Sequence, residues 1–400
     1  MARRPNVQRL TFVLLVVLAI NQVRVAMEGW GNFVLRHPGF ADFGNYYLYA
    51  RVGLNQGWSR LYDLAAQQHE WLRLGGPDVI PWFPIIYPPP LAWLVVPFTL
   101  LPLPVAFGCW TALLLGLILL TCRLVAPGPT RMSRWMVLAA MLAVFPVLFA
   151  LLLGQILIVE LAAVAGAWWL IGRGREIPAG ILLVALVFKP QIAILLPVIL
   201  LVIGRWRTVA VWFAGSAVVA LIAVITTGLS GLHDYAVRLA DAAAVAPQFL
   251  VPTQFTMAGL LGHGVVTIVV SALAVALTIA VAYRHRAEGA AIPVAAALVG
   301  SMLITPYLHY QDLSALLLAG GIALHGSLDR WQRTLMVLGY LLLLATSFWG
   351  WGFGLFSAVL GSTLVLTEAA WLLVTFRVSA SASATRPAVG FGQVPLDRTA

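Results

Sequence analysis

The chain has 400 residues, of which 62% are apolar and only 10% are charged, and its formal net charge is +10. Soluble domains carry about a quarter charged residues, so this composition excludes an ordinary soluble enzyme and indicates an integral membrane protein. The arginines are spread over many short loops rather than clustered in one domain. This distribution favours cytoplasmic loops between spans over a nucleic-acid-binding surface.

The apolar runs predict membrane-spanning helices, because they approach the roughly 20 residues that a span needs and do not alternate as barrel strands would. Arginine clusters at the ends of the runs, placed in the cytoplasm, set the orientation of each span. The expected spans are 11–28, 104–124, 135–152, 156–171, 178–188, 191–203, 208–226, 264–282, 290–304, 312–325, 334–348 and 355–375. We therefore expect an all-α fold, a polytopic bundle of about twelve spans with both termini in the cytoplasm.

The domain organisation follows from these spans. We expect a single transmembrane domain over residues 1–378 and a disordered cytoplasmic tail over 379–400, which is rich in Ser, Ala, Pro and Gly. The first run follows three arginines as a secretory signal does, but no small-residue cleavage site comes after it, so we expect an uncleaved span. The outside then receives a long first loop at 29–84, carrying interfacial helices, and a second loop at 227–263.

Two apolar segments do not fit a simple alternation of crossings. Residues 85–101 would reverse the orientation of all later spans if they crossed, so we expect a re-entrant or interfacial segment there. Residues 178–203 begin and end beside cytoplasmic arginines, and Lys189-Pro190 divides them in two. Because proline disfavours helix at the preceding residue, we expect two short helices that meet at Lys189 and line a cavity.

Asp42 is the first candidate for chemistry. It follows the first span in the aromatic segment GFADFGNYY (39–47), and an amphipathic stretch at 46–55 suits a helix on the membrane surface. A carboxylate held at the interface is well placed to accept a proton from the hydroxyl of an acceptor molecule. The alternative is structural, because aspartate is also a favoured N-cap at the start of a helix.

Three further polar residues lie inside apolar runs or at their outer ends. Lys189 is the only lysine of the chain, and it could bind a phosphate or form a structural pair with an acid such as Glu160; both interpretations stay open. His309, in an outer turn, could donate a hydrogen bond to a lipid phosphate. Gln155, in another outer turn, either bonds a sugar or satisfies backbone groups.

Signatures of a soluble catalytic domain are absent from the sequence: we find no phosphate-binding glycine loop, no metal-spaced His/Cys set and no Ser-His-Asp pattern. Cys109 and Cys122 fall in one expected helix and indicate neither a disulfide framework nor a metal site. An alternative hypothesis is a transporter or flippase of a lipid-linked sugar, with Lys189 and Glu160 along its path. The lack of an internal repeat disfavours that alternative.

Several short motifs follow one another in a fixed order between about residues 10 and 325. They are Asp42-Phe43, Leu61-Tyr62-Asp63, Tyr87-Pro88-Pro89 with Pro97 and Leu101-Pro102, Gly154-Gln155, Lys189-Pro190, and Pro306 with His309-Tyr310. In this order they resemble glycosyltransferase family 87, which contains polyprenol-phosphate-mannose-dependent α-mannosyltransferases with the GT-C fold.

The resemblance implies a multi-pass hexosyltransferase of the plasma membrane, of the GT-C type, with an extracytoplasmic active site. It would move a hexose, mannose in the first instance, from a polyprenyl-phosphate donor to a lipid-linked or cell-envelope glycan, with inversion. Asp42 would be the general base, His309 and Lys189 would hold the donor phosphate, and Gln155, Tyr87 and Tyr46 would line the sugar and acceptor pocket. We expect no resident cofactor or metal, although the sequence leaves a role for a divalent ion open.

Overall fold

The computed structural model describes residues 4–36, 42–76, 84, 86–128, 130–250, 255–349 and 355–377. Within these ranges the protein consists of helices and connecting turns, without a strand. The longer helices are α1 (Arg4–Arg36), α2 (Asp42–Gln56), α3 (Leu64–Arg73), α4 (Pro89–Val95), α5 (Leu103–Val125), α6 (Arg131–Leu142), α7 (Phe145–Leu153), α8 (Leu157–Ile171), α9 (Glu176–Leu183), α10 (Leu196–Val202), α11 (Trp206–Leu250), α12 (Met257–Leu261), α13 (Val265–His285), α14 (Ala291–Ile304), α15 (Ser314–Ala323), α16 (Arg330–Trp349) and α17 (Leu355–Arg377). Short 3-10 turns are η1 (Trp58–Arg60), η3 (Val96–Leu100), η4 (Val184–Val187), η5 (Pro190–Ala193), η7 (Arg286–Glu288) and η8 (Tyr310–Leu313).

Several helices of the molecule have the length of a membrane span. Five described helices are long and apolar enough to cross a membrane, and α6 with α7, bent by 73° at their junction, forms a sixth candidate. The expectation of an all-α membrane protein is therefore confirmed. The other expected spans are also helical, but several are shorter, for example Leu157–Ile171 and Ala291–Ile304. The count of twelve crossings stays a prediction.

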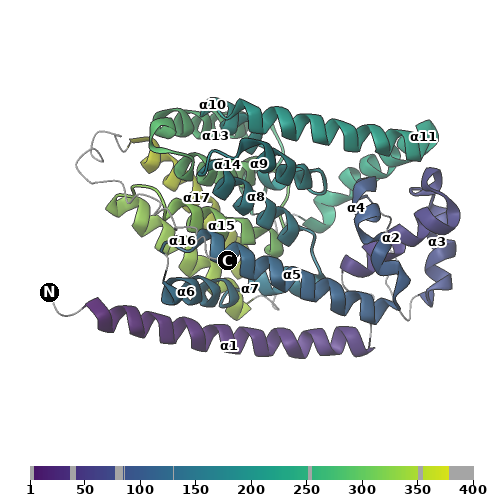
Figure 1. Cartoon of the computed structure of the whole chain (residues 1–400), viewed down its shortest axis with the longest axis horizontal. Coiled ribbons are helices and arrows are strands. Elements are labelled where there is room, and N and C mark those ends of the chain that lie inside the picture. The colour runs from purple at the N-terminus through teal and green to yellow at the C-terminus, as the bar shows by residue number, and fades with distance from the viewer. Residues whose placement is uncertain are drawn as a thin grey trace, which may run out of the picture.

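The helices are arranged with a layer of short elements at one end. Figure 1 shows α1 along one edge of the molecule, α11 along the opposite edge, and α2, α3 and α4 together at one end. The long N-terminal helix α1 packs against α6 and α7, and α2 packs against both α3 and α4. The end that carries α2 to α4 is the end that the arginine pattern places outside.

Local capping and one buried carboxylate hold the short helices together. Asp63 is the N-cap of α3 and accepts hydrogen bonds from the backbone N–H groups of Ala65 and Ala66, at 2.8 and 3.1 Å. The buried Glu70 of α3 accepts from Arg51 Nε at 2.8 Å and Asn55 Nδ2 at 2.7 Å, both on α2. Charge-assisted bonds from two residues of one helix fix α3 on α2.

The segment around Lys189 is broken as expected. The turn η4 leads to Lys189, whose φ of −149° and ψ of 68° are not helical, and η5 begins at Pro190. A proline disfavours the helical region for the residue before it, and Lys189 lies outside that region. The prediction of two short helices that meet at Lys189 is confirmed. The segment 85–101 also contains short helices, α4 and η3, rather than a helix of span length.

The second outer loop, expected at 227–263, is helical over much of its described length. The helix α11 continues to Leu250 past a kink at Gly228, where φ is 67° and ψ is 178°. Glycine adopts this left-handed φ without steric cost, so the chain changes direction and then resumes its helix. The second part of α11 contacts the first outer loop, since its Tyr235 stacks on Tyr62 with ring centroids 4.5 Å apart. The tail over 379–400 lies outside the described residues.

Candidate active site

Asp42, at the start of α2, is held by a residue from a distant turn. Its carboxylate accepts a hydrogen bond from the side-chain amide of Gln155, and the amide oxygen of Gln155 accepts from the hydroxyl of Tyr46 at 3.4 Å. Tyr46 lies one helical turn after Asp42, on the same face of α2. The described contacts of the Asp42 side chain are therefore with Gln155, not with the backbone N–H groups of its own helix, as the N-cap alternative required.

The turn that carries Gln155 requires a glycine. Gly154 ends α7 with φ at +68°, and the N–H of Gln155 returns to the carbonyl of Ala150 at 2.8 Å. A Cβ atom at Gly154 would lie 2.8 Å from Cβ of Phe43, which is too close for any side chain. The indole N–H of Trp110 donates to the carbonyl of Gly154 at 2.8 Å. The Gly154-Gln155 motif thus serves to place the Gln155 amide against Asp42.

Tyr87 closes the same cluster from the segment before α4. Its hydroxyl lies 3.5 Å from that of Tyr46, and the two rings meet edge to face with centroids 5.0 Å apart. Its carbonyl oxygen accepts hydrogen bonds from Tyr49 at 2.7 Å and from Tyr62 at 2.8 Å. Three of the residues predicted for the pocket, Gln155, Tyr46 and Tyr87, therefore lie together beside Asp42.

A second polar cluster joins Lys189 to the segment around His309. Lys189 and Asp312, both buried, form an ion pair. The other carboxylate oxygen of Asp312 accepts from the backbone N–H of His309 at 3.0 Å. One carboxylate thus connects the break after η4 to the turn after α14, and so positions both residues that were predicted to hold a phosphate.

The partner of Lys189 is consequently Asp312 and not Glu160, the acid that the structural alternative named. Glu160 is fully buried on α8, and neither of its oxygens makes a hydrogen bond of ordinary geometry with a described residue. It does lie near the charge and the peptide N–H of Lys189. Lys189 therefore has two acids beside it. Asp312 forms the ion pair, and only Glu160 had been named as a partner from the sequence.

Electrostatics link the two clusters. The pKa of Asp42 is raised from 3.8 to about 6, because the surrounding protein removes water from the carboxyl; the Asp312 charge also raises it, while the Lys189 charge and the Gln155 hydrogen bond lower it. Asp42 nonetheless keeps part of its surface exposed. A carboxyl that exchanges its proton near neutral pH and is open on one side has the properties of a general base.

His309 is half-buried, with its ring 5.8 Å from that of Tyr307. Burial lowers the pKa of His309, an effect that the nearby Lys189 strengthens and Asp312 opposes. A neutral imidazole donates one N–H hydrogen bond and carries no charge. His309 can therefore hydrogen-bond an anion, whereas Lys189 supplies the positive charge of the cluster.

Asp312 is the member of this cluster that sequence reasoning missed. No acid besides Asp42 was assigned to the site from the sequence. Two features of the sequence could have identified it. Lys189 is the only lysine and lies in an apolar run, where it needs a counter-charge, and Asp312 begins the apolar run that follows the His309 motif. As for metals, no three His, Cys, Asp or Glu side chains of the described residues are grouped so that they could hold an ion.

The fold and the site together define a helical membrane protein whose polar side chains gather where α2, the α7–α8 turn and the Lys189 break meet. Glycosyltransferase family 87 matches residues 85–306, which is more than half of the chain, and the protein belongs to that family. It is therefore a glycosyltransferase, with a sugar donor and a glycan acceptor. No curated protein and no solved structure matches the chain. The matched range includes Tyr87, Gln155 and Lys189, whereas Asp42 and His309 lie outside it.

Proposed function

We propose that the protein transfers a hexose, mannose in the first instance, from a polyprenyl-phosphate donor to a lipid-linked or cell-envelope glycan. The reaction takes place at the outer face of the plasma membrane, on a scaffold of the GT-C type, and inverts the anomeric carbon of the sugar. The family of the chain supports sugar transfer. The arginine pattern supports the outer face, because it places the end of the bundle that carries α2 outside.

The observation that carries the proposal is the Asp42 carboxyl, oriented by Gln155 and with its pKa raised to about 6. In the proposed step Asp42 takes the proton of an acceptor hydroxyl, and the hydroxyl oxygen attacks the anomeric carbon. The bond from that carbon to the donor phosphate breaks, and the phosphate leaves with the electron pair. A lipid phosphate is a good leaving group, so catalysis needs orientation and charge neutralisation more than an acid.

The Lys189–Asp312 pair is the proposed seat of the donor phosphate. An ammonium group has three N–H donors, and one of them is directed at Asp312. The other two are available to an anion, beside the His309 ring that the same Asp312 positions through its backbone N–H. We assign Asp312 as a positioning residue, because it holds Lys189 and His309 relative to each other and contacts no substrate in this scheme.

The aromatic residues beside Asp42 are the proposed sugar and acceptor contacts. The hydroxyls of Tyr46 and Tyr87 are 3.5 Å apart, at the outer limit of a hydrogen bond, so each can exchange that contact for a sugar hydroxyl. The amide of Gln155 is engaged on both sides, by Asp42 and by Tyr46. Its first role is therefore to orient the base.

A deletion strain tests the proposal. Mass analysis of its glycolipids and envelope glycans should show the loss of one hexose from a defined product, restored by the wild-type chain. The same strain should accumulate the acceptor that lacks this hexose. An unchanged set of glycans, or accumulation of a sugar-loaded lipid on the cytoplasmic side, would contradict sugar transfer and favour the flippase alternative.

A further inference from the structure

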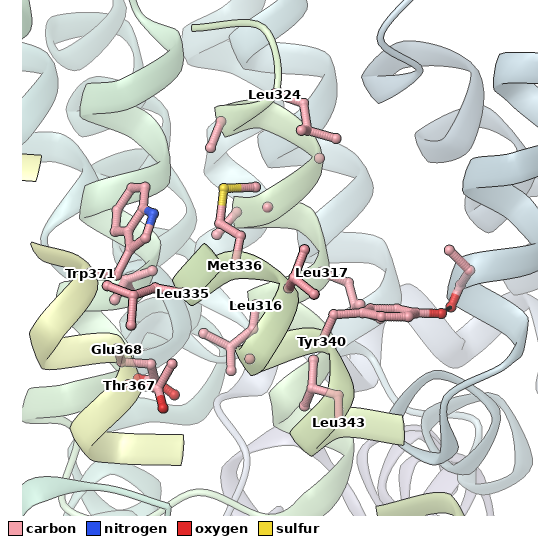
Figure 2. Close-up of a pocket in the computed structure, with 18 of the residues that line it drawn as sticks. Leu316, Leu317, Leu324, Leu335, Met336, Tyr340, Leu343, Thr367, Glu368 and Trp371 are labelled. Atoms are coloured by element: carbon pink, nitrogen blue, oxygen red, sulfur yellow. Dashed lines mark hydrogen bonds between the residues drawn. The ribbon is translucent and has the colours of Figure 1, made fainter. Parts of the chain in front are cut away.

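A cavity of about 460 Å³ lies among helices that take no part in the proposed reaction. It is bordered by α6, α14, α15, α16 and α17, and aliphatic side chains form most of its wall. Figure 2 shows Leu316 and Leu317 of α15 and Leu335, Met336 and Leu343 of α16 around it. None of the predicted site residues borders this space.

Glycines create part of the space. A Cβ atom at Gly320 on α15 would meet only Cε of Met336, at 3.8 Å, and one at Gly339 on α16 would meet only Cγ2 of Thr367, at 4.0 Å. Both are ordinary contact distances, so a side chain larger than hydrogen would extend into the cavity without a clash at its first atom. The helices leave this room because their facing residues are small.

Two buried polar groups on α17 line the cavity without partners. Trp371 and Glu368 are each 5% exposed, and neither the indole N–H nor the carboxyl oxygens have a hydrogen-bond partner among the described residues. Figure 2 shows the indole nitrogen of Trp371 turned toward Met336. Leaving a buried donor without a partner is energetically unfavourable, so these groups point to a ligand that satisfies them.

A charge stands at one end of the same cavity. Arg333 lines it and is exposed, and it has no acidic partner in the described part of the chain. Gln332 Nε2 donates a hydrogen bond to Thr375 Oγ1 at 3.2 Å. The first turn of α16 therefore lies beside the last turn of α17, at the same depth. Counted from that level, Trp371 lies about 6 Å and Glu368 about 10 Å further into the membrane.

We propose that this cavity binds an anionic phospholipid from the leaflet at the arginine-bearing face. One acyl chain fills the apolar space, the phosphate lies on Arg333, and an ester carbonyl accepts from the Trp371 N–H. A protonated Glu368 can donate to the second ester carbonyl. The order of charge, polar group and apolar wall along the cavity matches the order of phosphate, ester and chain in such a lipid.

The position of the charge separates this ligand from the sugar donor. Asp312 precedes the first residue of α15, whereas the cavity's end at Leu324 follows its last residue, Ala323. A lipid with its phosphate on Arg333 therefore belongs to the leaflet opposite the one that would present a phosphate to Lys189. The inference does not depend on the proposed function.

The test is photolabelling of the full-length protein in nanodiscs. The probes are phosphatidylglycerol and phosphatidylcholine that carry a diazirine in one acyl chain, and labelled peptides are mapped by mass spectrometry. We expect phosphatidylglycerol to label α15 to α17 more strongly. Arg333→Gln should lower that labelling about fivefold, since one basic side chain contributes about 1 kcal/mol toward an anionic lipid, and Arg333→Lys should retain most of it.

Three further variants complete the experiment. Arg330→Gln removes a neighbouring guanidinium that lies over the Trp331 ring, 5.0 Å from its centroid, and does not border the cavity, so labelling should not change. Gly339→Leu fills the space and should abolish labelling while the protein stays monodisperse; Gly320→Ala should reduce it by a smaller factor. Equal labelling by both lipids would overturn the proposal. So would labelling that neither Arg333→Gln nor Gly339→Leu changes, or labelling that polyprenyl phosphate displaces better than phosphatidylglycerol does.

Discussion

The cluster around Asp42 and the cavity between α15 and α17 differ in how their polar groups are satisfied. Around Asp42, side chains from α2, the α7–α8 turn and the segment before α4 are bonded to one another. In the cavity, polar groups are few, Glu368 and Trp371 have no hydrogen-bond partner among the described residues, and most of the wall is apolar. The comparison indicates that the cavity between α15 and α17 suits a hydrocarbon chain, whereas chemistry requires side chains that other side chains hold in place.

Replacement of Asp42 should have the largest effect. Asp42→Asn keeps the shape of the side chain and an acceptor for the Gln155 amide, but it cannot take a proton, so sugar transfer should fall by about 10²- to 10⁴-fold. Transfer rates in proteoliposomes measure this. Asp63→Asn is the matched control, because Asp63 is also an acid of the outer layer but caps α3. Comparable activity in both variants would remove Asp42 from the chemistry.

The Lys189–Asp312 pair can be broken in two ways that separate structure from function. Lys189→Met leaves the Asp312 carboxylate buried and unpaired, which should destabilise the protein by about 3–5 kcal/mol and abolish transfer. The double variant Lys189→Met/Asp312→Leu removes both charges, so it should recover the thermal stability in detergent but not the transfer. Recovery of transfer in the double variant would show that the pair is structural only.

The pH dependence of transfer follows from the Asp42 carboxyl. Its pKa is raised to about 6, so kcat/KM should fall as the pH drops below that value and the base takes up a proton. The Gln155 hydrogen bond lowers this pKa, hence Gln155→Leu should move the acidic limb to higher pH. If kcat/KM of the wild type fell only near pH 4, the burial of this carboxyl would be contradicted. If Gln155→Leu left the pH of that fall unchanged, the effect of the Gln155 hydrogen bond would be contradicted.

The same raised pKa has a consequence for folding. Between pH 3.8 and about 6 the folded state holds a proton on Asp42 that the unfolded chain has released. The contribution of Asp42 to the free energy of unfolding should therefore decrease as pH rises through this window and stay level above it. Urea or thermal unfolding of the wild type and of Asp42→Asn would isolate that slope, which the variant should lack.

Gly154→Ala should have the smallest effect. A left-handed φ costs an alanine about 1–2 kcal/mol, and the added Cβ also meets Phe43, so the melting temperature should fall and the Gln155 amide should shift. Gly174→Ala is the control, because Gly174 has a φ of +72° but open space around it. A loss of transfer in the first variant and not in the second would assign the effect to the position of Gln155.

Sequence reasoning identified most members of the candidate site but few of their contacts. The break at Lys189 was predictable because Pro190 acts on its direct neighbour. The bond between Asp42 and Gln155 joins residues 113 positions apart, and no local pattern encodes it. The pairing of Lys189 with Asp312 required a choice among several acids. The helix after Gly228, which packs against distant residues such as Tyr62, was not predicted from the sequence.

The central claim is that this protein forms a glycosidic bond with a sugar from a lipid phosphate. The most direct measurement is the incubation of the purified wild-type chain in proteoliposomes with polyprenyl-phosphate mannose and a glycolipid extract from the deletion strain. The account predicts a new mannoside whose anomeric configuration is opposite to that of the donor. Movement of the labelled lipid across the bilayer without a new glycosidic bond would contradict it.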